Sequence, residues 1–150
     1  MPKIDLDATP ETNRTSYPEP YATAMARRHF RRLAPAAGLS TIGASLVRVE
    51  PGGVSSQRHW HDAIDELVVV LEGEGVLIEE GGEIVLKAGD CAAFPMGAAN
   101  GHHIVNRGDA DCLFLAVSGP EAGDCHYPDA DLHWDAAGNR YTRKDGTPYG

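Results

Sequence analysis

Two histidines and a glutamate stand in the sequence at a spacing that suits metal binding. His59 and His61 are two residues apart, so on a β-strand both imidazoles project from the same face. Glu66 follows after the segment DAID, whose turn character would bring a carboxylate back to the pair. Two imidazoles and a carboxylate suit Fe, Mn, Ni, Co, Zn or Cu. We therefore expect one divalent transition metal per chain, with its identity left open.

The elements that must position these side chains are short strands. The chain has 17 Gly and 10 Pro among 150 residues, and they recur as turn signals between short apolar runs. Strands are expected in TIGASLVRVE, ELVVVLE, GVLIEE and DCLFLAVS. Residues 22–33 fit a helix or a strand, and we favour a strand that pairs with residues 41–49. Short strands at close spacing indicate an all-β sandwich or barrel in a single domain.

The surroundings of the metal-binding residues resemble a known family. Gly53, His59, His61, Glu66 and Gly73 match the first cupin motif, G-x5-H-x-H-x3,4-E-x6-G, at every position. The resemblance implies a cupin double-stranded β-helix, the jelly-roll barrel. It also implies a homodimer, with an outward Trp60 and the C-terminal aromatic residues available to cover an interface.

The second cupin motif, G-x5-P-x-G-x2-H-x3-N, departs from the pattern in its second half. Gly89, Pro95 and Gly97 match, but Asn100 stands where the family has histidine. Two inserted residues restore the motif with His102 and Asn106. His102 is therefore the expected fourth ligand and His103 the alternative, because strand alternation lets only one of these neighbours face the barrel axis. Asn100 is a remote third choice, since an amide is a poor ligand beside imidazoles.

The organisation that follows is a barrel between two arms. We expect an N-terminal arm at residues 1–20 and the barrel at residues 21–118. Residues 119–150 would form a C-terminal arm that packs on the barrel or on a partner subunit. Within the barrel, the first motif spans residues 53–73 and the second residues 89–106.

Alternation along the strands also predicts the lining of an apolar pocket around the metal. We expect the lining to include Gln57, Ile64, Val68, Ile104 and Asn106. The run RRHFRR at 27–32 could attract a phosphate or carboxylate, but a solvated strand face is the favoured reading. Asp62 and Asp65 are read as turn residues more readily than as partners of a ligand imidazole.

Charge and cysteine content narrow the partners. A formal charge of −9 argues against nucleic acid and an anionic membrane surface. Cys91 and Cys112 are expected in the core, whereas Cys125 and His126 lie in the arm without a visible partner; three widely spaced cysteines favour reduced thiols. The acidic, Pro-containing start does not resemble a signal peptide, so a cytoplasmic protein is expected.

Three functions use the same site. The resemblance makes metal-dependent isomerase or epimerase chemistry on a sugar or sugar phosphate plausible, although no general base is evident beyond Gln57, His103 or His126. Iron or copper would instead support a dioxygenase. A binding module that holds a small molecule without turnover is the third alternative. We favour an enzyme acting on a small polar metabolite.

Overall fold

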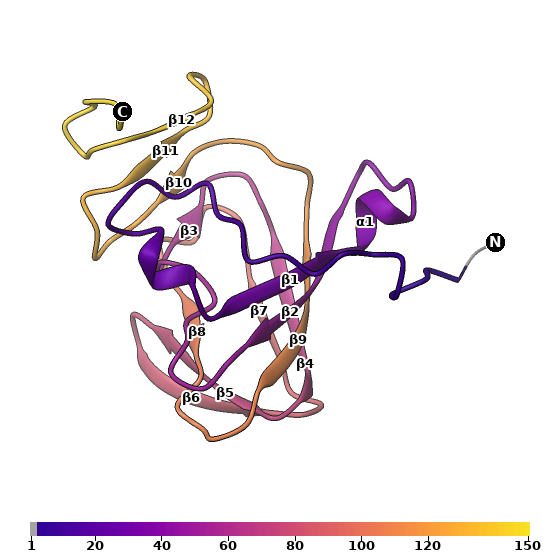
Figure 1. The fold of residues 1–150 in the computed structure, drawn as a ribbon. Coiled ribbons are helices and arrows are strands. Elements are labelled where there is room, and N and C mark those ends of the chain that lie inside the picture. Colours follow the sequence, from indigo (N-terminus) through magenta and orange to yellow (C-terminus); the bar gives the residue numbers. More distant parts are fainter. Residues whose placement is uncertain (1–2) are drawn as a thin grey trace.

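A computed structural model describes residues 3–150 as a nearly all-β protein (Figure 1). Its elements are a 3-10 helix η1 (Thr23–Met25), β1 (Arg28–Arg32), the short helix α1 (Leu33–Ala36), β2 (Gly43–Val49), β3 (Trp60–His61), β4 (Glu66–Glu72), β5 (Glu74–Glu79), β6 (Gly82–Lys87), β7 (Cys91–Phe94), β8 (His103–Val105), β9 (Cys112–Ser118), β10 (Cys125–His126), β11 (His133–Asp135) and β12 (Arg140–Thr142). No helix among the described residues is long and apolar enough to cross a membrane.

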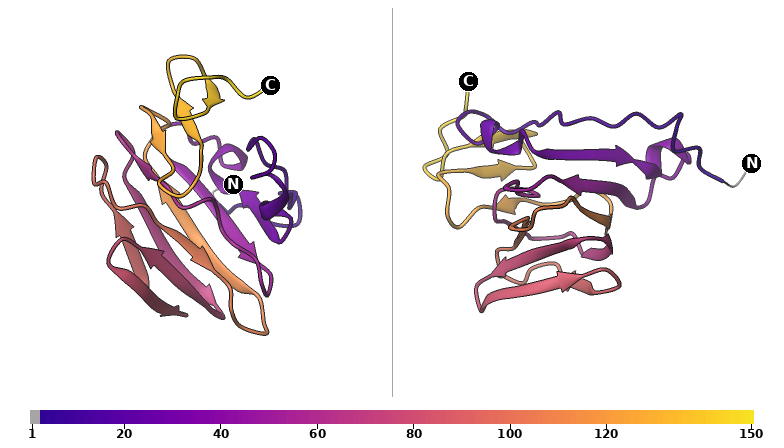
Figure 2. Two further views of the ribbon diagram at one scale, coloured as in Figure 1. Left: turned by 90° about the vertical axis from the view of Figure 1, so that its left-hand side faces the viewer. Right: turned by 60° about the horizontal axis from the view of Figure 1, so that its bottom comes forward.

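The strands form three antiparallel sheets. The largest has the order β1-β2-β9-β4-β7, the second β6-β5-β8, and the third β12-β11-β10-β3. Figure 2 shows the strands of the barrel running in stacked layers, with the C-terminal strands at one end and the N-terminal arm alongside β1. A backbone bridge between Thr12 and Phe30 fastens that arm to β1. The expected all-β jelly roll is confirmed.

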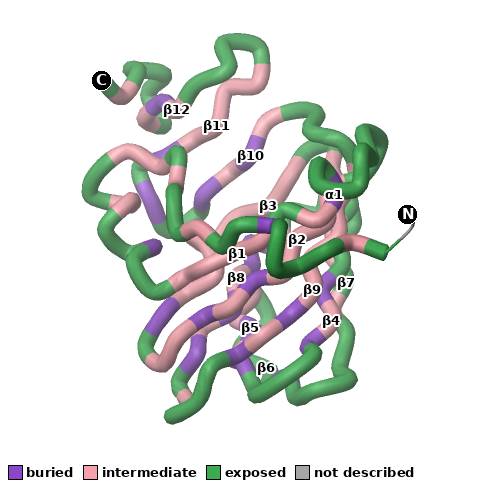
Figure 3. The backbone as a smooth tube through the Cα atoms, turned by 45° about the vertical axis from the view of Figure 1, so that its right-hand side comes forward, coloured by how far each residue is buried: buried purple, intermediate pink, exposed green. Residues whose placement is uncertain are grey.

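The core lies between the first two sheets. It draws on β2, β4 and β9 from one sheet and on β5, β6 and β8 from the other, with Val49, Val70, Leu77, Ile104 and Phe114 among its members. Buried positions alternate with partly exposed ones along these strands (Figure 3), as expected where one face of each strand meets the core. Apolar burial of this kind is the main stabilising contribution.

Residues 22–33, for which the sequence allows a helix or a strand, contain both kinds of element. β1 pairs with β2 over Arg28–Arg32, as predicted, but the residues before and after it are helical. In the register, Arg28 lies opposite Val49 and Phe30 opposite Val47. Directly opposed side chains share a face of an antiparallel sheet, and both valines are buried in the core. Arg28 and Phe30 therefore face inward, so the reading of this run as a solvated face is wrong for half of its side chains.

The C-terminal arm has a small core of its own. Cys125, Tyr127, Ala130 and Leu132 are buried together, with five partly buried aromatic residues around them: Tyr17, Tyr21, Trp134, Tyr141 and Tyr149. Tyr17 comes from the N-terminal arm and Tyr21 follows directly after it, so the two arms pack on each other. The arm also joins the barrel, because β10 pairs with β3.

One turn of the first motif shows why glycine is needed there. Gly73, between β4 and β5, has φ +71°, a left-handed conformation that L side chains rarely adopt. A Cβ at this position would also collide with the backbone carbonyl of Asp111. Glycine thus allows the chain to reverse tightly beneath the loop that leads into β9.

Candidate metal centre

Four side chains of the two motifs meet around one carboxylate. Glu66, the first residue of β4, has Oε2 2.9 Å from His102 Nε2 and 3.7 Å from His59 Nε2. Its Oε1 lies 3.6 Å from His61 Nε2. Two donors that each bind an ion at about 2.1 Å are separated by roughly 3.0–3.4 Å at octahedral or tetrahedral angles. The 2.9 Å distance lies just below this range and the other two slightly above it. His59, Glu66 and His102 offer donor atoms that all lie within 4.8 Å of one another, whereas His61 belongs to a neighbouring group with His59 and Cys125.

Backbone pairing places the ligands. His59 and His102 form an isolated antiparallel bridge, with hydrogen bonds of 3.2 and 2.9 Å between their backbones. His61 is held from the other side, because its carbonyl accepts the N–H of Gly97 at 2.8 Å. Backbone hydrogen bonds of Gly97 and His102 therefore hold the second motif against His61 and His59 of the first.

Two imidazoles are oriented by backbone carbonyls. Nδ1 of His59 lies 2.8 Å from the carbonyl of Gln57, and Nδ1 of His102 lies 3.0 Å from the carbonyl of Asn100. A carbonyl only accepts, so each Nδ1 carries a proton and donates it, and Nε2 is the ring atom that faces Glu66, at 2.9 Å for His102 and 3.7 Å for His59. When Nε2 is unprotonated, its lone pair is free to bind a metal. This donor set fits a divalent metal.

The electrostatics of Glu66 agree with this arrangement. Burial opposes ionisation of the carboxyl group, but hydrogen bonds with His102, His59 and His61 outweigh it and hold the pKa of Glu66 well below its usual range. The ionised carboxylate is the form that binds a metal.

His102 and His103 differ in the way the alternation predicts. His102 is 5% exposed and stacks flat on Phe94, with ring centroids 3.5 Å apart and an interplanar angle of 5°. His103 instead donates from Nδ1 to the carbonyl of Ser56 at 2.9 Å, and burial lowers the pKa of its imidazole. The side chain of Asn100 bonds Glu79 and the backbone of Glu80 instead of facing the cluster.

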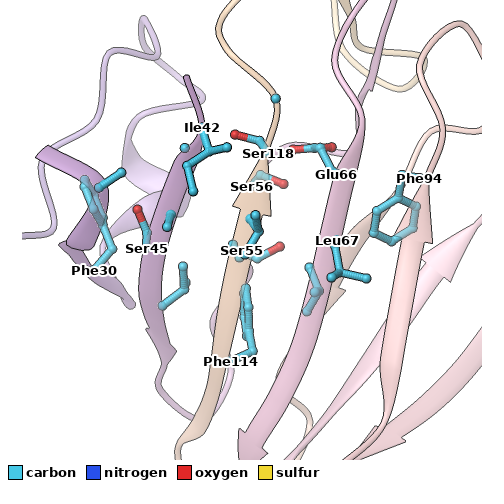
Figure 4. A pocket seen from close by; sticks show the side chains of 18 of the residues that line it. Phe30, Ile42, Ser45, Ser55, Ser56, Glu66, Leu67, Phe94, Phe114 and Ser118 are labelled. Carbon is cyan, nitrogen blue, oxygen red and sulfur yellow. The ribbon is translucent and has the colours of Figure 1, made fainter. Parts of the chain in front are cut away.

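A cavity of about 730 Å³ opens beside the cluster. His59, Glu66 and His102 line it together with Val68 and Ile104. In Figure 4, Glu66 and Ser118 lie at one end of the cavity and Phe114 at the other, with Phe30 and Ser45 along the side formed by β1 and β2. The wall is mainly apolar with a few hydroxyl groups, as in many sites for small ligands.

The expected lining needs correction at three positions. Ile64 lines a smaller pocket behind the cluster, next to His61. Gln57 is not part of the cavity wall, and its side chain donates to the carbonyl of Tyr21 at 3.4 Å. Asn106 is 0% exposed and does not reach the cavity. Its side-chain amide instead donates hydrogen bonds to the carbonyls of Val49 and Ala110. Strand alternation gives the face of a residue but not its distance from a cavity.

Sequence reasoning missed the residues that surround the ligands from the C-terminal arm. Cys125 lies opposite His61 in the pairing of β10 with β3, and its sulfur lies within 4.8 Å of ligand-type nitrogens of His59 and His61. Burial raises the pKa of the Cys125 thiol to about 12. Tyr127 lies beside His59, with ring centroids 6.0 Å apart. No local pattern could have indicated these neighbours, since more than 60 residues separate the two segments.

Other residues singled out by the sequence have structural partners. Trp60 stacks on His126 at 4.0 Å between ring centroids, and His126 bonds Asp62 at 2.9 Å, so the arm of the same chain covers this tryptophan. Asp65 accepts the N–H of Met96 at 2.8 Å, which is a turn role.

Two expectations about cysteines are wrong. Cys91 is exposed, whereas Cys112 is buried as expected. Cys125, expected to have no partner, is buried close to His59 and His61.

Comparison with known proteins now places the chain in a family. A family model described as a cupin domain matches residues 45–118. A crystal structure of a sugar phosphate isomerase from a cupin superfamily, from Silicibacter pomeroyi, is 45% identical, with a TM-score of 0.93 over 99% of this chain and 97% of that chain. The chain belongs to the cupin superfamily.

Two further cupin relatives come from Thermotoga maritima. An oxalate-binding protein is 39% identical over 67 residues, which is 45% of this chain and 54% of that protein, so the match spans only about half of its length. The structure of a predicted oxalate decarboxylase is 28% identical, with a TM-score of 0.54 over 63% of this chain and 81% of that chain.

Proposed function

We propose that this cupin is a metal-dependent enzyme that acts on a small polar metabolite, with one divalent transition metal held by His59, His61, Glu66 and His102. The observation that carries the proposal is the convergence of three imidazoles on one partly buried carboxylate at the wall of a cavity. A metal bound there would act as a Lewis acid on a carbonyl or hydroxyl group of the substrate.

The reaction class we favour is isomerisation of a sugar phosphate. It is supported by the similarity to the Silicibacter protein, which extends over nearly the whole of both chains. In such a reaction the apolar wall around Val68 and Ile104 limits the access of water to the reacting carbon atoms. The carbonyls of Gln57 and Asn100 keep two ligand imidazoles in the tautomer that can bind metal.

The test is turnover measured together with metal content. We expect the metal-loaded protein to interconvert an aldose phosphate and a ketose phosphate, for example glucose 6-phosphate and fructose 6-phosphate, without consuming O2. Glu66→Gln should lose metal and turnover together, whereas His103→Ala should keep its metal. Turnover that persists in metal-free protein, or metal-loaded protein inactive on a panel of sugar phosphates, would contradict this proposal.

A second candidate is a protein that binds a small molecule without turning it over. The similarity to an oxalate-binding protein favours it, although the match covers about half of each chain. Saturable binding of oxalate by the metal-loaded protein, with oxalate recovered unchanged, would support this candidate. Consumption of O2 with substrate would instead favour the dioxygenase, which stays a prediction.

We also propose that two copies of the chain associate through the outer face of the large sheet. Leu46, Leu115 and Val69 are directly paired across β2, β9 and β4, and their neighbours along each strand point into the core. Leu71, also on β4, is 44% exposed. A continuous apolar sheet face of this kind is a typical site of association. Sedimentation velocity should give a dimer that Leu115→Arg dissociates; a monomeric unmodified chain would contradict the proposal.

A further inference from the structure

Arg28 is a cation in the cavity wall without a carboxylate partner. Its inward position follows from the register that places it opposite the buried Val49. The terminal nitrogens donate to two backbone carbonyls, of Ser55 at 3.4 Å and of Arg14 at 3.2 Å, and Nε is buried with no hydrogen-bond partner among the described residues. No carboxylate among residues 3–150 lies within 4.0 Å of the guanidinium.

This arrangement differs from that of the arginines with a structural role. Arg58 bonds two acidic side chains and Arg48 bonds three, and such bonds raise the pKa values of both guanidinium groups. Burial instead lowers the pKa of Arg28, and only the hydroxyl groups of Tyr17 and Tyr141, not a carboxylate, oppose this effect. A cation removed from water and left unpaired costs stability, so its presence in a cavity suggests a role other than stability.

The position of Arg28 connects it to the metal cluster. Its guanidinium donates to the carbonyl of Ser55, while the hydroxyl of the next residue, Ser56, lies 3.3 Å from Nδ1 of the ligand His59. Arg28, Ser55, Ser56 and His59 all line the same cavity. A single small molecule in this cavity therefore has the ligand cluster and a guanidinium on its walls.

The charges around the cavity favour an anion beside Arg28. Its lining contains two carboxylates, Glu66 within the ligand cluster and Glu121 in the segment after β9, and a second cation, the exposed Arg32. Each terminal nitrogen of Arg28 has one N–H left beyond its bond to a carbonyl. Two such N–H groups are the fork that binds a carboxylate or phosphate with two parallel hydrogen bonds. Desolvation strengthens that attraction.

We propose that Arg28 recognises an oxyanion, a carboxylate or phosphate group, on the small molecule whose opposite end reaches the metal. The second half of this statement rests on the proposed function, whereas recognition of the anion does not. Phe30, whose ring lies 4.9 Å from the guanidinium carbon, holds the guanidinium from one side. Specificity then follows from charge: a neutral sugar of the same size lacks the group that Arg28 binds.

The test is calorimetric titration of the metal-loaded protein with fructose 6-phosphate, oxalate and fructose. We expect the unmodified chain to bind at least one of the two anions and to bind fructose more weakly. Arg28→Gln should weaken binding of that anion about ten- to a hundredfold, the range for a hydrogen-bonded charge, and leave fructose unaffected. Which anion responds distinguishes phosphate from carboxylate.

Arg27→Gln is the matched control. It removes the same charge one residue away, from a side chain that donates to the carbonyl of Pro51 and does not line the cavity. It should bind the anion as the unmodified chain does. Melting temperatures provide a second readout: Arg28→Gln should melt no lower than the unmodified chain without ligand, because it removes an uncompensated charge.

Three outcomes would overturn the proposal: unchanged anion binding by Arg28→Gln, equal weakening in both variants, or binding of neither anion by the unmodified chain. Metal content, measured on each sample, separates this proposal from the proposed function. A chain that lacks metal but binds an anion through Arg28 would refute the metal-dependent enzyme and leave anion recognition intact. A chain that contains metal but whose anion binding does not depend on Arg28 would refute only the anion recognition by Arg28.

Discussion

Replacement of Asn106 by alanine is predicted to destabilise the barrel strongly. The side chain is 0% exposed, donates from Nδ2 to the carbonyls of Val49 and Ala110 at 2.8 Å each, and accepts the N–H of Gly108 at 2.9 Å. Each bond contributes about 1 kcal/mol, and a buried group left unpaired adds roughly 1–3 kcal/mol. Only the Val49 partner is fully buried, since the other two lie in an accessible loop. The expected loss is therefore about 4–6 kcal/mol, a large part of typical domain stability.

Urea unfolding measures this loss. A chelator should be present, so that bound metal does not contribute to stability by mass action. Asn100→Ala is the control, because Asn100 makes two side-chain hydrogen bonds but is only half-buried, so its loss leaves no fully buried group unpaired. It should lose about 2 kcal/mol. Equal free energies of unfolding for the two variants, or a loss below about 1 kcal/mol for Asn106→Ala, would refute the reasoning.

Two further predictions concern the turn after β4 and the thiols. Gly73→Ala should lower the free energy of unfolding by about 1–3 kcal/mol more than Gly52→Ala does, measured by thermal or urea unfolding. Both glycines have positive φ, but only at Gly73 would a Cβ collide with backbone, at Asp111. Equal losses for the two variants would contradict this close approach. Ellman's reagent should modify the exposed Cys91 in the folded chain and the two buried cysteines only after unfolding; rapid modification of all three would show that the arm does not cover its thiol.

Local pattern predicted the parts of the fold that depend on alternation. ELVVVLE forms β4 with the bounds Glu66–Glu72, because a short run rich in β-branched residues between turn signals favours a strand. Alternation then gives the faces, with Val68 and Val70 in the core. The same alternation separated His102, whose Nε2 faces Glu66, from His103, whose Nδ1 bonds the carbonyl of Ser56, although both residues line the cavity. The candidate ligands could be predicted because motif spacing and strand geometry act within each of two short stretches, residues 53–73 and 89–106.

Long-range pairing could not be predicted in this way. The arm strand β10 lies beside β3 because of contacts between segments more than 60 residues apart, and these contacts cover Trp60 and bring Cys125 to the ligands. Arg28 faces inward because of its register with β2, which a charged run such as RRHFRR conceals. Phe94 was the one missed neighbour with a local signal, since it alternates with Ala92 on the inner face of β7.

The central claim is that His102, and not His103, completes a metal site with His59, His61 and Glu66. The most direct test is elemental analysis of protein purified without an affinity tag, for the unmodified chain, His102→Ala and His103→Ala. We predict about one equivalent of a transition metal in the unmodified chain and in His103→Ala, and loss of metal in His102→Ala. No metal in the unmodified chain after incubation with Fe, Mn, Ni, Co, Zn and Cu, or loss in His103→Ala alone, would contradict the claim.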